Sequence, residues 1–193
     1  MADTDERPAF IVDAMLGRLA KSLRMLGYDT AYEPNTDDND LKMTAFREGR
    51  VLLTRDREIA KTDLPLNVLL IESDDLEGQL LETAREFDLR SGEELFSRCL
   101  ICNVEVEDAP SSEVRGQVPE YVFTTQSRFS RCPSCRRIYW AATHVEHARV
   151  WLERVLRSGD DGPGDGRPAG RRTQASSECA EAHEPPDEQR GER

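Results

Sequence analysis

Two cysteine pairs are the most specific chemical signal in this sequence. Cys99 and Cys102 form one C-x2-C pair, Cys132 and Cys135 form a second, and 29 residues separate the pairs. Each pair supplies two thiolates from one tight turn, and two such turns complete a tetrahedral shell around Zn2+. A four-thiolate shell leaves no open coordination position. The spacing therefore predicts a zinc ribbon in which the metal is structural.

Two disulfides, or a redox pair of the thioredoxin type, are the alternatives for these cysteines. Disulfides are rare in the cytosol, and a redox centre would need one C-x-x-C rather than two.

His144 and His147 follow the ribbon with a spacing of three residues. Because four thiolates already satisfy zinc, we expect polar contacts at the ribbon surface, with His144 able to contact a phosphate or a base.

A second signal is a set of aspartates that follow predicted strands or begin predicted helices. Carboxyl ends of parallel strands meet at one edge of a sheet, and ligands bind in the crevice there. Clustered carboxylates select Mg2+ or Mn2+, which orient water and stabilise charge on phosphate. Each aspartate can instead cap a helix. The candidates are Asp13, Asp38 (or Asp40), Asp56 and Asp74 (or Asp75), and capping is the favoured alternative for all except Asp13 and Asp56.

Alternating strand and helix patterns supply the frame for these aspartates. A helix over 16–26 is predicted from apolar residues at helical spacing, with Arg18, Lys21 and Arg24 on its other faces. The alternation predicts the α/β class, with a parallel sheet and crossover helices. Strands are predicted at 10–12, 28–32, 51–54 and 68–71, and further helices at 40–49, after Asp56, at 76–87 and at 143–156.

Charge is distributed unevenly along the 193 residues, whose net charge is −12. Residues 1–96 carry 12 basic and 22 acidic side chains, whereas residues 97–157 carry 9 and 7, so the cysteine module is the one basic part. Only three of the 26 basic residues are lysines, a halophile-like composition that stays soluble where salt screens repulsion. We expect three parts: an α/β domain at 1–96, a zinc ribbon with a C-terminal helix at 97–157, and a disordered acidic tail at 158–193.

Apolar runs such as 68–71 are far too short to span a bilayer, and the N-terminus is polar and acidic. These features predict a cytoplasmic protein without a membrane partner. They leave the oligomeric state open.

The segments Val12–Asp29, Leu52–Asp56, Ser97–Asn103 and Cys132–Trp140 together resemble the Mut-seven C-terminal RNase domain family. The resemblance extends from residue 10 to about residue 156. It implies a PIN-like fold, a parallel sheet flanked by helices, followed by a small zinc ribbon. It also implies a ribonuclease in which Asp13 and Asp56 match motif aspartates, and Asp38 falls in the matching acidic stretch.

The leading hypothesis is metal-dependent hydrolysis of RNA phosphodiester bonds. Asp13, Asp38, Asp56 and Asp74 would be catalytic, and Asp13 and Asp56 in particular would hold Mg2+ or Mn2+. Aromatic residues such as Phe129, Tyr139 and Trp140 could stack on bases, although some must pack under the ribbon. The alternative is a non-catalytic RNA-binding or ribosome-associated adaptor that uses the ribbon. The predicted substrate-binding residues are Arg18, Arg55, Arg128, Arg131, Arg136, Arg137 and His144.

The predicted zinc ribbon also leads to an expectation about folding. In so small a module the energy of metal binding is folding energy. Loss of zinc should therefore unfold the chain from about residue 97 onward while the N-terminal domain survives.

Overall fold

The computed structural model describes residues 7–160, apart from residues 93 and 142. The predicted tail lies outside the described residues from residue 161 onward. Within the described part, no helix is both long and apolar enough to cross a membrane.

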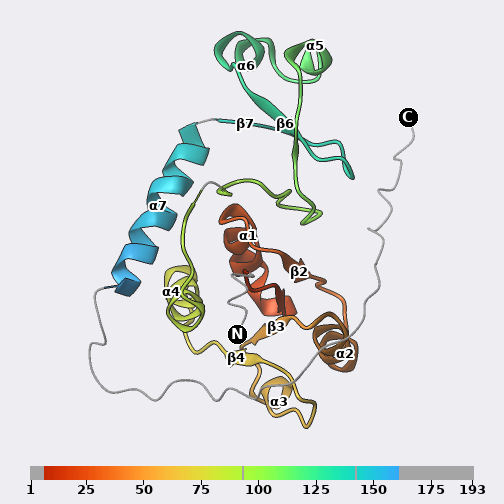
Figure 1. The fold of residues 1–193 in the computed structure, drawn as a ribbon, viewed down its shortest axis with the longest axis vertical. Helices are drawn as coiled ribbons and strands as arrows, with labels where there is room; N and C mark the ends of the chain where they lie inside the picture. The colour runs from red at the N-terminus through yellow and green to blue at the C-terminus, as the bar shows by residue number, and fades with distance from the viewer. Residues whose placement is uncertain (1–6, 93, 142, 161–193) are drawn as a thin grey trace, which may run out of the picture.

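Four parallel strands form the central sheet in the order β2-β1-β3-β4 (Figure 1). Phe10 of the first strand pairs with Thr30 on one side and with Val51 on the other. The sheet confirms the predicted α/β class, and each of its strands lies within a segment that was predicted to be a strand. The strands are β1 (Phe10–Val12), β2 (Thr30–Tyr32), β3 (Val51–Thr54) and β4 (Val68–Leu70).

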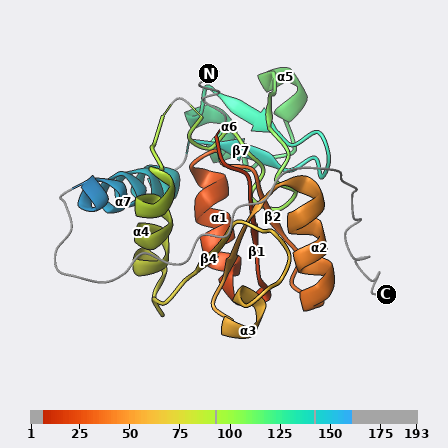
Figure 2. The ribbon, with the colours of Figure 1, turned by 60° about the horizontal axis from the view of Figure 1, so that its bottom comes forward.

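Helices cover both faces of this sheet. Successive side chains of a strand point to opposite faces, so each strand can contribute to two cores. Phe10 and Val12 join the larger core with α1, α4 and α7, whereas Ile11 joins the smaller core with α2 and α3. Figure 2 shows α4 and α7 on one side of the sheet and α2 on the other. The helices are η1 (Ala14–Leu16), α1 (Gly17–Met25), α2 (Asp38–Glu48), α3 (Arg57–Ala60), α4 (Leu76–Phe87) and α7 (Thr143–Asp160).

Aspartate side chains begin several of these helices. Asp37 accepts the amides of residues 39 and 40 at the start of α2, Asp56 caps α3 and Asp75 caps α4. Such side-chain caps satisfy amides that have no partner within the helix. At the other end of α2, Gly49 adopts a left-handed φ of 61°, which glycine tolerates without strain. The acidic runs therefore do cap helices, as the sequence indicated.

The cysteine module is a three-stranded antiparallel sheet in the order β5-β6-β7, at one end of the molecule (Figure 1). Two short helices between β5 and β6 were not predicted, because four to six residues give too little periodicity. Val114 and Phe129 are the centre of a small separate core. The elements are β5 (Glu107–Asp108), α5 (Ser111–Val114), α6 (Glu120–Thr125), β6 (Phe129–Arg131) and β7 (Ile138–Trp140).

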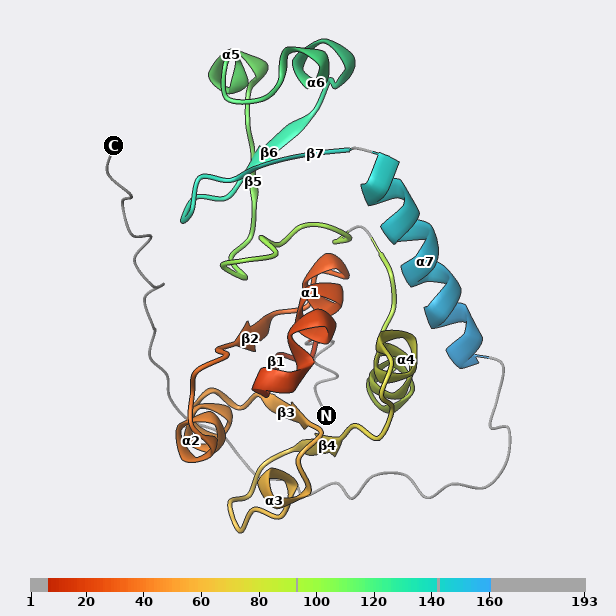
Figure 3. The ribbon, with the colours of Figure 1, turned by 180° about the vertical axis from the view of Figure 1, so that it is seen from behind.

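After the cysteine module the chain returns to the α/β domain through α7. Figure 3 shows α7 running alongside α4. Leu152 and Val155 of α7 are buried in the larger core, at 0% and 1% exposure. The predicted domain boundary between residues 96 and 97 stays a prediction, but α7 packs against α4 and contributes to the larger core of the α/β domain.

Candidate functional site

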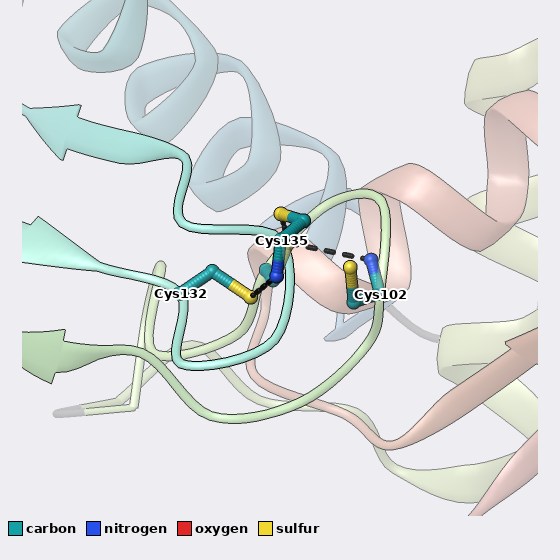
Figure 4. A group of neighbouring side chains, drawn as sticks. Cys102, Cys132 and Cys135 are labelled. Carbon is teal, nitrogen blue, oxygen red and sulfur yellow. Dashed lines mark hydrogen bonds between the residues drawn. The ribbon is translucent and has the colours of Figure 1, made fainter. Parts of the chain in front are cut away.

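Four cysteine sulfurs converge where the two knuckles of the ribbon meet. Figure 4 shows three of these residues, Cys102, Cys132 and Cys135. The Sγ atoms of Cys99, Cys102, Cys132 and Cys135 all lie within 4.8 Å of one another, and those of Cys99 and Cys135 are 3.7 Å apart. Tetrahedral zinc with Zn–S bonds of about 2.3 Å requires S–S distances of about 3.8 Å. None of the four is in a disulfide. The donor set and its spacing fit a structural zinc ion.

Hydrogen bonds to the cysteine sulfurs favour the thiolate form of Cys99. The amide of Cys102 donates to Cys99 Sγ at 3.3 Å, and the amide of Cys135 donates to Cys132 Sγ at 3.4 Å. The Tyr139 hydroxyl also lies 3.1 Å from Cys99 Sγ. Burial favours the neutral thiol of Cys99, but these hydrogen bonds outweigh it and lower the pKa of Cys99 to about 6. Tyr139 therefore supports the metal site, where the sequence had suggested a stacking surface.

The first knuckle is attached to the α/β domain by a buried arginine of α1. Arg24 is 4% exposed, and its Nε donates to the Thr30 carbonyl at 2.9 Å. Its Nη1 donates to the carbonyls of Leu100 and Ile101, both at 2.9 Å. Burial lowers the pKa of Arg24, and the negative charges of Cys99 and nearby acidic groups oppose that shift. The prediction that Arg24 faces away from the core was wrong, and its position one turn after Ala20 was the available signal.

Asn103 makes the second attachment, just after the first cysteine pair. Its φ of 65° is left-handed, a region that asparagine enters more readily than most residues. The side chain accepts the Thr30 amide at 2.9 Å and donates to Asp29 at 2.6 Å. Burial raises the pKa of Asp29, but hydrogen bonds from Arg50 and Asn103 outweigh this effect and lower it. Neither Asn103 nor Asp29 carried a sequence signal for this role.

Asp13 lies at the carboxyl edge of the central sheet, directly after β1. It is 4% exposed, and its carboxylate accepts the amides of Met15 at 2.8 Å and Arg55 at 2.9 Å and the hydroxyl of Thr54. In the order β2-β1-β3-β4, the point where the strand order reverses lies between β1 and β3, and α/β proteins bind ligands at such a point. Asp13 therefore occupies the position in this fold that is typical of a ligand site.

Thr54 connects Asp13 to the next candidate. Its Oγ1 accepts the Asp56 amide at 2.9 Å while its hydroxyl donates to Asp13. Asp56 is exposed and caps α3, with Oδ1 accepting the amides of Glu58 at 2.7 Å and Ile59 at 3.4 Å. Thr54 itself was missed by the sequence analysis, although it sits inside the Leu52–Asp56 motif.

The other two aspartates are more peripheral. Asp38 is exposed in the first turn of α2, where Asp37 makes the cap. Asp74 is 92% exposed and pairs with Arg55, next to the Asp75 cap of α4. In the described part of the chain, the four cysteines are the one group of at least three potential ligands near enough to share an ion. The four aspartates follow strands of one parallel sheet, but they do not form such a group.

The predicted substrate-binding arginines divide into two sets. Arg131 bonds to the Glu113 carboxylate at 3.0 Å and to its carbonyl at 3.1 Å, and Arg55 pairs with Asp74. The Nε atom of Arg55 is buried and has no partner among the described residues. His144 belongs to α7, but its side chain lies outside the described residues. Among the predicted substrate-binding arginines, those that are exposed and have no ion-pair partner in the described structure are Arg18, Arg128, Arg136 and Arg137.

Comparison with known proteins agrees with this architecture. The family model described as the Mut7-C RNAse domain matches residues 8–152. No curated protein and no solved structure matches the chain. The family match covers most of the sequence and includes both the parallel sheet and the four-cysteine module. The chain therefore belongs to the Mut7-C RNAse domain family.

Proposed function

We propose that this protein is a metal-dependent ribonuclease whose reaction centre is the carboxyl edge of the sheet between β1 and β3. Membership in an RNase domain family supports a nuclease role with RNA as substrate. The observation that carries the proposed chemistry is Asp13, a buried carboxylate without an ion-pair partner among the described residues. Buried charges are normally paired or bound to a metal.

The unused lone pairs of the Asp13 and Asp56 carboxylates support this assignment. A carboxylate has about four acceptor positions. Asp13 uses one at Oδ1 and two at Oδ2, so one position at Oδ1 remains. Asp56 uses only Oδ1, and no described group donates to its Oδ2. These two residues are therefore the best candidates to hold Mg2+ or Mn2+, which would activate water and stabilise the charge that develops on phosphate.

The remaining predicted residues take supporting roles in this proposal. Asp74 holds Arg55 beside the site, which favours a phosphate-binding role for that guanidinium. Asp38 would contribute from the start of α2. Of the predicted substrate-binding residues, the exposed and unpaired Arg18, Arg128, Arg136 and Arg137 would contact the RNA backbone, and His144 would add a further contact.

A non-catalytic RNA-binding adaptor remains the second candidate. The observation in its favour is that Asp13, Asp37, Asp56 and Asp75 all act as helix caps, and the predicted aspartates do not gather around one point. In that case the zinc ribbon would bind RNA and the sheet edge would be structural.

Cleavage of end-labelled single-stranded and hairpin RNA by the full-length protein separates the two candidates. Reactions are run with Mn2+, with Mg2+ and with chelator, at moderate and high salt. Asp56→Asn should abolish cleavage, since asparagine still caps a helix but lacks the charge that attracts a cation. Asp75→Asn is the matched control, because Asp75 caps α4 in the same manner, and it should cleave normally. RNA binding without cleavage by the wild type would favour the adaptor.

A further inference from the structure

The attachment of the first zinc knuckle to α1 and β2 suggests a role for Arg24 that the proposed nuclease chemistry does not use. Its guanidinium is almost fully buried inside the α/β domain. Its three described hydrogen-bond acceptors are carbonyls, and two of them belong to Leu100 and Ile101, between the zinc ligands Cys99 and Cys102. The knuckle therefore solvates a buried cation.

Arg24 in turn stabilises the zinc site. Four thiolates around Zn2+ carry a net charge of −2, and a nearby cation stabilises that charge. Residues that surround metal ligands orient them and tune metal affinity. By bonding both carbonyls of the Cys99–Cys102 turn, Arg24 also holds the backbone that presents the two sulfurs.

Asn103 and Arg98 reinforce the same attachment. The Asn103 side chain bonds to the Thr30 amide and to Asp29, at the start of β2. Arg98 donates to the carbonyls of Gly27 and Asn103, at 3.0 Å and 2.9 Å. The knuckle is thus bonded to the turn between α1 and β2 on several sides, and β2 pairs with β1, which leads into Asp13.

We propose that Arg24 is a positioning residue for the zinc site that couples zinc binding to the stability of the α1–β2 region. When zinc leaves and the knuckle loses its shape, Arg24 would remain as a buried charge without those acceptors, which is costly. The coupling is reciprocal, because each event changes the other by the same factor. It also adds to the expectation that the N-terminal domain survives loss of zinc, because the α1–β2 region should be less stable without the metal.

Hydrogen exchange measured by mass spectrometry on the full-length protein tests one direction of the coupling. Peptides that cover residues 10–32 are compared with and without zinc, which is removed by a chelator. We expect at least about tenfold faster exchange around Thr30 without zinc, since the acceptor of its amide is Asn103 of the knuckle. Unchanged protection over 10–32 in the zinc-free protein would overturn the proposal.

Zinc affinity, measured by competition with a chromogenic chelator, tests the other direction. Arg24→Met keeps most of the side-chain volume, and it should weaken zinc binding by about 10- to 100-fold. Lys21→Met removes an exposed charge from the same helix and should leave affinity unchanged. Asn103→Ala probes the attachment from the knuckle side if Arg24→Met does not fold. Wild-type zinc affinity in both Arg24→Met and Asn103→Ala would contradict the coupling, and none of these readouts depends on RNA cleavage.

Discussion

The Thr54 hydroxyl donates a hydrogen bond to the Asp13 carboxylate, and the same oxygen accepts a hydrogen bond from the Asp56 amide at 2.9 Å. Two strand ends of the sheet are joined in this way through one buried side chain. The two aspartates of the proposed reaction centre therefore have their relative position set by a residue that carries no charge.

Thr54→Val should lower the free energy of unfolding by about 1–3 kcal/mol and abolish RNA cleavage. Valine has a similar shape but leaves the Asp13 carboxylate and the Asp56 amide each without one partner. Urea unfolding and the RNA assay measure the two effects. Thr54→Ser keeps the hydroxyl and should restore most of the activity, and a fully active Thr54→Val would show that the bridge is dispensable.

Asp13→Asn should be destabilising by about 1–3 kcal/mol, even without divalent metal. Each carboxylate oxygen accepts from at least one donor, so an amide NH2 group would face another donor whichever way it is turned. If repulsion between clustered carboxylates dominated instead, its relief in Asp13→Asn would preserve or raise stability. Thermal unfolding of Asp13→Asn and wild type in the presence of a chelator distinguishes destabilisation from unchanged or raised stability. Asp56→Asn is the comparison, and it should unfold close to the wild-type temperature.

Arg136→Ala combined with Arg137→Ala should weaken RNA binding, since both side chains are exposed and unpaired among the described residues. The salt dependence of binding should become shallower by about 0.7 in slope for each phosphate that the variant no longer neutralises. Filter binding over a range of salt concentrations measures this slope. Arg131→Ala is the contrast, because its bond to Glu113 predicts a change in ribbon stability. An equal loss of RNA affinity in Arg131→Ala would mean that the ion pair opens to bind RNA.

Asp29 should make stability depend on pH in the acid range. Its pKa in the folded protein lies below the ordinary value of 3.8, so its contribution is complete above that value and is lost as pH falls through the folded pKa. Asp29→Asn should therefore lower the midpoint of urea unfolding at pH 7. The difference in midpoint between Asp29→Asn and wild type should shrink below about pH 4. Asp63→Asn, an exposed position without an ion pair in the described structure, should follow the wild type at every pH. A constant gap between Asp29→Asn and wild type would rule out the charge as the cause.

Local patterns in the sequence were sufficient for the main strands and helices of the α/β domain and for the zinc ligands. Apolar runs of three or four residues predicted the strands at 10–12, 51–54 and 68–71, because buried parallel strands lack polar alternation. The C-x2-C spacing predicted the convergence of Cys99, Cys102, Cys132 and Cys135, since ligand pairs in tight turns are a local feature. The aspartates at helix starts were also identified, and their capping bonds follow from chain-local geometry.

Interactions between distant segments required the tertiary structure. Arg24 and Leu100 are 76 residues apart in the chain, and helical spacing alone could not show that a cation on α1 would meet knuckle carbonyls. The packing of α7 into the larger core likewise depends on where the chain leaves the ribbon after β7. The composition of the helix does not determine it. The arrangement of the aspartates was decided in the same way. The sequence predicted them at one edge of the sheet. Strand order and the Thr54 bridge determine how Asp13 and Asp56 lie relative to each other, because side-chain distances depend on packing between elements.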